Sequence, residues 1–250
     1  MTLDDLTPVT RLPRTRRRQL FNVLAVLAFC VALGALSLPK VARVREPAAR
    51  MNDMNNLKQL MLAEHIRADT LDNAFIGPFA ADRQGVPNTG LSFRVSLLPY
   101  LEQENVYRLI DLQQPWDSAQ NAPATSCVIK VFQSPVTPDR TKPDTPYRVF
   151  YGGGALFEAD GAPVKLKEVP DGTSNTILCV HATEAVPWAK PQEFPYARTT
   201  PLPPLGSKGM SRGFNVAFAD GSVRFVRDTI AEADLRSLIE KADGRGAGVE

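Results

Sequence analysis

Cysteine is scarce in this sequence, with three residues among 250, namely Cys30, Cys127 and Cys179. So small a number excludes the disulfide framework of small secreted domains, and the spacing fits no zinc site. Cys30 lies in an apolar run, so Cys127 and Cys179 are the candidate pair for a single disulfide. That bridge requires neighbouring strands with Cα atoms about 4.4 to 6.8 Å apart. The alternative is two buried free thiols, because free cysteine is among the most buried residue types.

Histidine is scarcer still, which limits the chemistry to be expected. The two histidines, His65 and His181, form no metal spacing, and a lone histidine is usually structural. There is no nucleophile elbow, no Ser-x-x-Lys motif and no phosphate-binding loop. Gly152-Gly153-Gly154 lacks the rest of a phosphate-loop pattern and indicates a tight bend. We therefore expect no enzyme activity, no metal and no cofactor.

The chain also lacks an excess of charge. Its 29 basic and 27 acidic residues leave a net charge of +2, so no general attraction to nucleic acid is expected. Hydrophobic residues make up 44% and charged residues 22%, which excludes both a disordered chain and a membrane protein with many spans.

One long uncharged run interrupts this even distribution. Residues 20–38 read LFNVLAVLAFCVALGALSL and follow a tail, residues 1–19, that is rich in arginine. A helix of this length rises about 28 Å, close to the hydrocarbon thickness of a bilayer. We predict a transmembrane helix at 20–38, with the basic tail in the cytoplasm and the remainder outside the cytoplasmic (inner) membrane. The alternative is a cleaved signal peptide, which also exports the remainder.

A helical pattern resumes over residues 40–70, which are predicted to form a stalk that continues the anchor. Pro39 and Pro47 should kink or interrupt it, because each removes a backbone donor. Apolar residues recur at three- and four-residue spacing along one face. They are Met51, Met54, Leu57, Leu60 and Met61.

Residues 71–250 are expected to form an α+β head. A second helix is predicted at residues 96–110. Short β-prone runs cut by Gly and Pro then predict strands at Val128–Phe132, Tyr147–Tyr151 and Thr176–Val180. Six prolines between Pro187 and Pro204 exclude a regular helix or a central strand, so residues 187–204 are predicted to be a long loop.

The clearest local structure is a hairpin within FNVAFADGSVRFV, residues 214–226. Asp220 and Gly221 between two alternating strands predict a two-residue type I′ turn with positive φ at both residues. In that register Phe218 faces Val223 across the hairpin.

A C-terminal helix should follow, with a capping box of Thr229 and Glu232 and with Gly244 as its end. The expected fold is thus a long N-terminal helix, first transmembrane and then packed on the head, with an antiparallel β-sheet and a short C-terminal helix.

Two loops hold candidate binding residues. Asp171, Thr173 and Asn175 are a weak calcium candidate. Because Ca²⁺ needs six or more oxygen ligands, a turn closed by its own side chains is the favoured alternative.

The second loop holds a candidate binding surface for a peptide or glycan, formed by Trp188 with Pro187 and Glu184. The alternative is that Trp188 clamps the proline-rich loop onto the core.

Several strings in fixed order resemble a bacterial prepilin-like family that carries domain of unknown function 1559. They are AARMNDMNNLKQL (48–60), SLLPYLEQENVY (96–107), VPDGTSNTILCV (169–180), EAVPWAKP (184–191) and GFNVAFADGSVRF (213–225). The resemblance implies a type IV pilin-like start, a pilin-like α+β head and a place in the cell envelope. It implies no biochemical activity.

The sequence departs from the family at three places. Where members open with Gly-Phe-Thr-Leu-Ile-Glu, residues 18–22 read RQLFN, so the resemblance predicts neither cleavage nor methylation here. Members commonly have two cysteines where Asp53 and Ser134 stand, and the joint loss suggests that these cysteines normally pair. Members also often have Glu at the position of His181.

These observations predict a non-catalytic, single-pass, pseudopilin-like protein of the cell envelope. Its expected partners are the lipid bilayer, through residues 20–38, and other envelope or pilin-like proteins of a type II-secretion-like or pilus-like assembly. The alternative is an extracytoplasmic binding module for a peptide or glycan. A hydrolase is the alternative with the least support.

Overall fold

The computed structural model describes residues 14–75, 77–81, 87–136, 139–207, 210 and 212–244. The chain divides into two units, Met1–Pro47 and Ala48–Glu250, and each is considered by itself. The predicted tail falls mostly outside the described residues, and the side chains of residues 20, 21 and 31–38 in the predicted span do so too.

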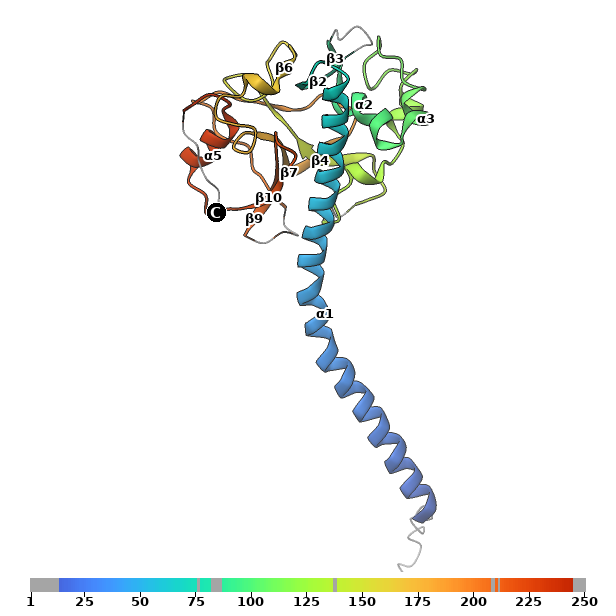
Figure 1. The fold of residues 1–250 in the computed structure, drawn as a ribbon. Helices are drawn as coiled ribbons and strands as arrows, with labels where there is room; N and C mark the ends of the chain where they lie inside the picture. Colours follow the sequence, from blue (N-terminus) through green and yellow to red (C-terminus); the bar gives the residue numbers. More distant parts are fainter. Residues whose placement is uncertain are drawn as a thin grey trace, which may run out of the picture. The chain divides into compact units, whose positions relative to one another are not determined.

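Helix α1 (Arg14–Asp69) supplies the described part of the first unit and enters the second (Figure 1). It runs through Pro39 and Pro47, so the predicted interruption is wrong. Each proline removes one backbone hydrogen bond, and in a helix of 56 residues the bonds on either side maintain the helix. Among the described residues, no helix is long and apolar enough to cross a membrane.

In the second unit α1 packs into the larger of two hydrophobic clusters. Of the predicted stripe, Leu57, Leu60 and Met61 are buried, whereas Met51 is exposed. The stripe therefore begins to face the core within the second unit, one turn beyond Met51.

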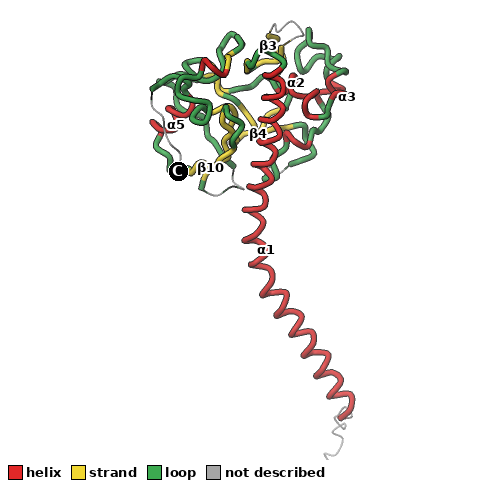
Figure 2. Tube along the Cα trace, in the orientation of Figure 1, coloured by secondary structure: helices red, strands yellow, loops and turns green. Residues whose placement is uncertain are grey.

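The head is a mixed helix-and-sheet fold built on small sheets, as Figure 2 shows. Its central sheet has the order β10-β9-β7-β4, and all neighbours in it are antiparallel. Its strands are β4 (Asp144–Arg148), β7 (Ile177–Pro187), β9 (Gly213–Phe218) and β10 (Val223–Arg227). The mixed α+β prediction is confirmed at this level.

Three two-stranded sheets surround the central one. β1 (Ala74–Phe75) pairs with β6 (Val164–Lys165), and β2 (Phe79–Ala81) pairs with β3 (Pro87–Ser92). β5 (Phe150–Tyr151) pairs with β8 (Phe194–Pro195) and is parallel to it. The last pair joins the proline-rich segment to the chain that follows β4.

The helix predicted at residues 96–110 is wrong. The chain there forms α2 (Arg94–Leu97), η1 (Leu98–Leu101) and α3 (Glu104–Tyr107). Glu102 adopts a left-handed conformation, with φ +59°, which ends a right-handed helix. The other short helices are α4 (Ala122–Thr125), η2 (Lys130–Phe132) and η3 (Leu166–Glu168).

Two of the three predicted strands differ from the structure. The strand at Val128–Phe132 is absent, because residues 130–132 turn into η2. The strand at Tyr147–Tyr151 is divided between β4 and β5, which pair with different partners. The third, at Thr176–Val180, lies almost wholly within the longer β7.

The C-terminal hairpin is present, but its turn is not the predicted one. Val223 faces Ala217 instead of Phe218. The N–H of Phe218 donates to the carbonyl of Ser222, and the N–H of Gly221 donates to the carbonyl of Phe218. Gly221 has φ +84°, whereas its predecessor does not have a positive φ. This is a type I turn followed by a glycine bulge, and the bulge shifts the register by one residue.

The C-terminal helix α5 (Glu232–Ile239) follows as expected, but without the predicted ends. Its N-cap is Ala231, which makes no side-chain capping bond, and its C-cap is Glu240. The box of Thr229 and Glu232 and the stop at Gly244 are therefore wrong. Thr229 precedes the cap by two residues, so the required spacing is not met.

Replacing Gly221 by Val should lower the free energy of unfolding by more than about 1 kcal/mol, because a β-branched residue tolerates positive φ poorly. A Cβ at this position would lie 3.5 Å from His65 Cε1, an ordinary contact, so the cost is conformational. Gly221→Asn is the control and should be much milder, since Asn tolerates the left-handed region. Urea denaturation measures both, and an unchanged midpoint for Gly221→Val would contradict the assigned turn.

Candidate functional site

The centre of the head contains a fully buried carboxylate, that of Asp53 on α1. Its Oδ1 accepts hydrogen bonds from the Tyr147 hydroxyl, at 2.7 Å, and from the Ser134 hydroxyl. Its Oδ2 accepts hydrogen bonds from Asn215 Nδ2, at 2.7 Å, and from His181 Nδ1, at 3.0 Å. Because a carboxylate offers about four lone-pair sites, these four donors satisfy it.

The central sheet places three of the four donors in one row. Tyr147 on β4 lies opposite His181 on β7. Val180 pairs with Val216 on β9, and the antiparallel register continues with Asn215 opposite His181. Side chains directly opposite each other share a face of the sheet. The row therefore points to a single place, which Asp53 occupies.

The protonation states follow from these contacts. Burial, the largest single influence, raises the pKa of Asp53. The hydrogen bond and attraction from His181, with the bonds from Ser134 and Tyr147, outweigh it, so the pKa of Asp53 lies below its ordinary value. Burial first, and then the charge of Asp53, hold the pKa of Tyr147 well above its usual range. At neutral pH the pair is a carboxylate and a neutral phenol donor.

This arrangement holds parts of the chain together and is not open to a substrate. Asp53, Ser134, Tyr147, His181 and Asn215 are each at most 1% exposed. The donors come from three strands and from the chain after η2, while the acceptor comes from α1. Four hydrogen bonds thus connect the helix to the sheet and to the chain after η2, and we call these five residues the Asp53 cluster.

A second buried charge pair holds the proline-rich segment. Arg94 Nη2 lies 2.7 Å from Glu193 Oε1, and both side chains are fully buried. The guanidinium also donates to three backbone carbonyls, those of Tyr147, Trp188 and Lys190. Glu193 Oε2 accepts the N–H of Val149. Because the partners are mutually satisfied, the pair tolerates burial.

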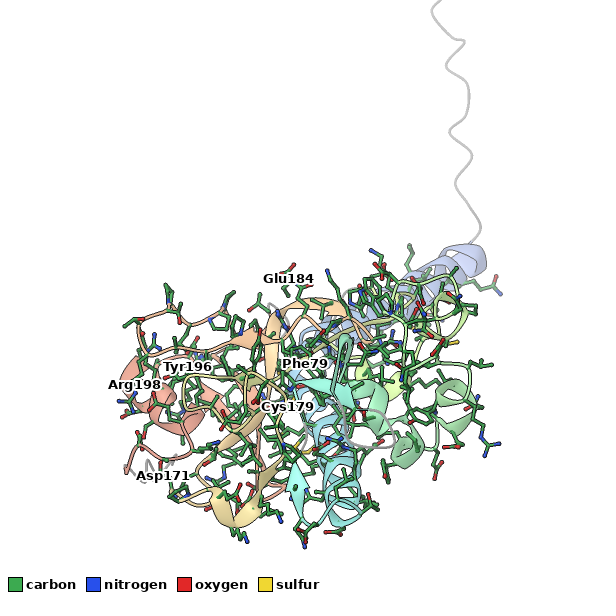
Figure 3. The ribbon with its side chains drawn as sticks, turned by 90° about the horizontal axis from the view of Figure 1, so that it is seen from above. Phe79, Asp171, Cys179, Glu184, Tyr196 and Arg198 are labelled. Atoms are coloured by element: carbon green, nitrogen blue, oxygen red, sulfur yellow. The ribbon has the colours of Figure 1, made fainter. Side chains whose placement is uncertain are left out.

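The predicted binding surface at Trp188 is wrong, because this side chain is 0% exposed. Its ring stacks on Phe132 with centroids 5.5 Å apart, and its Nε1 donates to the carbonyl of Cys127 at 2.9 Å. Pro187 is half-buried, and Glu184 is exposed on β7, as Figure 3 shows. Trp188 thus clamps the proline-rich loop onto the core.

The calcium candidate is a turn. The carboxylate of Asp171 accepts the backbone N–H groups of Asp243 and Gly244, at 2.6 and 3.1 Å. Asn175 Nδ2 donates to the Asp171 carbonyl, and the Thr173 carbonyl accepts the N–H of Asp220. Among the described residues, no three His, Cys, Asp or Glu side chains converge on a metal position. The turn anchors the C-terminal segment.

The predicted disulfide is not formed, since Cys127 and Cys179 are both free. Cys127 follows α4 in a turn, where its thiol donates to the carbonyl of Pro123 at 3.4 Å. Cys179 is buried within β7, and burial raises the pKa of its thiol far above the usual value. The bridge required Cys127 to lie at the start of a strand, and that strand does not exist.

His65, the other histidine, is also structural. Its ring nitrogens lie 2.8 Å from the carbonyl of Met61 and 3.1 Å from that of Ala219. It therefore joins α1 to the hairpin turn.

Another polar cluster lies near the C-terminus. Tyr196 donates to Glu240 Oε1 at 2.7 Å, and Arg198 Nε lies 2.9 Å from the same oxygen; Figure 3 labels Tyr196 and Arg198. The hydrogen bond from Arg198 holds the pKa of Glu240 below its ordinary value. A cavity of about 280 Å³ beside them is lined by residues of both charges, so it has no preference for one sign.

Sequence reasoning missed Tyr147, Asn215 and Arg94 as members of buried polar clusters. One signal was available for the first cluster. Asp53 lies four residues before Leu57, on the core-facing stripe of its helix, where an acidic residue requires buried donors. Nothing comparable marks the donors, because their convergence depends on strand order.

Comparison with known families gives one result. The model of a family described as protein of unknown function (DUF1559) matches residues 42–202, which is more than half of the chain. No curated protein and no solved structure matches.

The lowered pKa of Asp53 predicts a pH dependence. Its contribution to stability should be complete above the unfolded pKa of about 3.9 and should be lost as the pH falls through the folded pKa. Asp53→Asn removes the titrating group, so the gap in unfolding free energy between wild type and variant should shrink on acidification. Urea denaturation over a pH series measures it.

The control is Asp117→Asn, at an exposed aspartate. This change should alter stability little at any of the pH values. A gap for Asp53→Asn that stays constant down to the lowest accessible pH would contradict the assigned charge state.

Proposed function

The chain belongs to the DUF1559 family of proteins of unknown function, and on that premise we propose that it is a non-catalytic, pseudopilin-like protein of the bacterial cell envelope. In this proposal residues 20–38 cross the cytoplasmic membrane once, with the N-terminus inside. The head is pilin-like and lies outside, where it takes part in a type II-secretion-like or pilus-like assembly.

The observation that carries the proposal is the exposure of apolar side chains on α1. Residues 22–30 are all exposed. The large apolar ones are 56–65% exposed, and they are Val23, Leu24, Val26, Leu27 and Phe29. Covering such a side chain stabilises by about 1.5–3 kcal/mol, so this segment requires an apolar environment. A bilayer supplies one on all sides of a helix.

A second observation favours a structural role for the head. The carboxylates of Asp53 and Glu193 are buried, and their hydrogen bonds and ion pairs come from groups within the protein. A catalytic acid or base must reach the proton that it transfers. These groups instead join α1, the central sheet and the proline-rich segment, as expected of side chains with a structural role.

The full-length protein should remain in the membrane fraction after carbonate extraction. Replacing Leu24 and Leu27 by Arg should release it, because an arginine near the centre of a spanning helix costs roughly 2.5–3.5 kcal/mol. Leu109→Arg is the matched control, since Leu109 is 61% exposed in the head, and it should stay in the pellet.

A wild-type protein found in the soluble fraction would contradict the anchor. N-terminal sequencing distinguishes an uncleaved anchor from pilin-type processing. The mature chain should begin upstream of Leu20, and a methylated residue near Phe21 would instead indicate pilin-type processing.

A further inference from the structure

The central sheet ends in β10, a strand of five residues that has a neighbouring strand on one side only. On that side β9 pairs with it from Val223 to Arg227 without a break. In the described part of the chain, no further strand and no isolated bridge pairs with its outer edge. Such an edge offers backbone donors and acceptors to which another extended chain can bind.

The register of the hairpin shows which backbone groups of β10 point outward. The N–H of Phe218 donates to the carbonyl of Ser222, and beyond this bonded pair the non-bonded and bonded pairs alternate. The Arg227 carbonyl accepts the N–H of Ile230. The other outward N–H and C=O groups have no backbone partner among the described residues. They belong to Val223, Phe225 and Arg227.

Arginine side chains flank this edge on both faces of the sheet, because successive residues of a strand point to opposite faces. On one face, the half-buried Arg224 lies over the ring of Phe218, 4.6 Å from its centroid. On the other face Arg227 is exposed, and Arg50 of α1 lies 3.9 Å from the centroid of the Phe225 ring. Within the described residues, neither Arg224 nor Arg227 forms an ion pair.

These charges indicate an acidic partner. Opposite charges on neighbouring strands stabilise a sheet, and like charges destabilise it. A second copy is a poor occupant, because its own β10 would bring two further arginines to the edge. Asp228 is exposed directly after β10, but in the described chain it pairs with neither arginine.

We propose that the outer edge of β10 is a docking site for an extended, acidic segment of another protein. The segment adds a further strand to the central sheet. Its backbone pairs with the outward groups of β10, and its carboxylates lie beside Arg224 and Arg227. The site belongs to the head and does not depend on the membrane anchor.

The probe is a fluorescent peptide in which Glu alternates with Val, and its binding to the full chain in micelles of an uncharged detergent is measured by anisotropy. Wild type should bind it saturably, and should bind a Lys-Val peptide of the same length roughly ten-fold more weakly or worse. Arg227→Glu should reduce or reverse this preference. Arg140→Glu is the matched control and should leave it unchanged, because Arg140 is also exposed but lies outside β10.

Two substitutions at one position distinguish backbone pairing from charge. Arg227→Gln and Arg227→Pro both remove the guanidinium, but only proline also removes the outward N–H, and an edge strand tolerates proline at such a position. The Gln variant should weaken binding roughly three-fold and the Pro variant roughly ten-fold or more. Urea denaturation establishes that both variants are folded. A Glu-Val peptide that is N-methylated at every residue tests the same point on the wild type and should not bind.

Absence of saturable binding to the wild type overturns the proposal. Equal affinity for the Glu-Val and Lys-Val peptides does so too, as does binding of the N-methylated peptide. Sedimentation equilibrium is run on the same preparations. Self-association of the wild type that Arg227→Pro abolishes would assign the edge to a second copy, and it would also overturn the acidic partner.

Discussion

The carboxylate of Asp53 is the point on which the head depends. A buried charge is costly unless it is paired and fully hydrogen-bonded, and here four donors from separate parts of the chain meet that requirement. Hydrogen bonds are directional, so they fix the helix at one position along the sheet. The hydrophobic contacts of Leu57 and Leu60 add stability without such a preference. The proline-rich segment is held in the same way, through Arg94 and Glu193.

The Asp53 cluster includes two positions at which the sequence departs from the family that it resembles. The resemblance implies cysteines in place of Asp53 and Ser134, and in this chain the two side chains are in direct hydrogen-bond contact. A polar cluster therefore stands where the resemblance implies a covalent link. Its strength does not depend on an oxidising environment, and the three cysteines of the chain remain free.

Local patterns in the sequence were reliable where structure is local. The stripe on α1, the strand at Cys179 and the position of the C-terminal hairpin follow from the spacing of apolar residues. The failures depend on single residues or on distant partners. The left-handed Glu102 divides a predicted helix, the bulge at Gly221 shifts a register, and Val128 has no strand to pair with. The convergence on Asp53 was beyond prediction, because it requires the order β9-β7-β4 and a residue 128 positions away from His181.

The most direct test of the central role of Asp53 is a double-mutant cycle between Asp53→Asn and Tyr147→Phe, measured by urea denaturation. Because the two side chains share a hydrogen bond of 2.7 Å, their effects should be non-additive by roughly 0.5–3 kcal/mol. Tyr196→Phe, whose hydroxyl binds Glu240 instead, should be additive with Asp53→Asn. Additive effects for the Asp53 and Tyr147 pair would contradict the claim that one shared network ties helix α1 to the sheet.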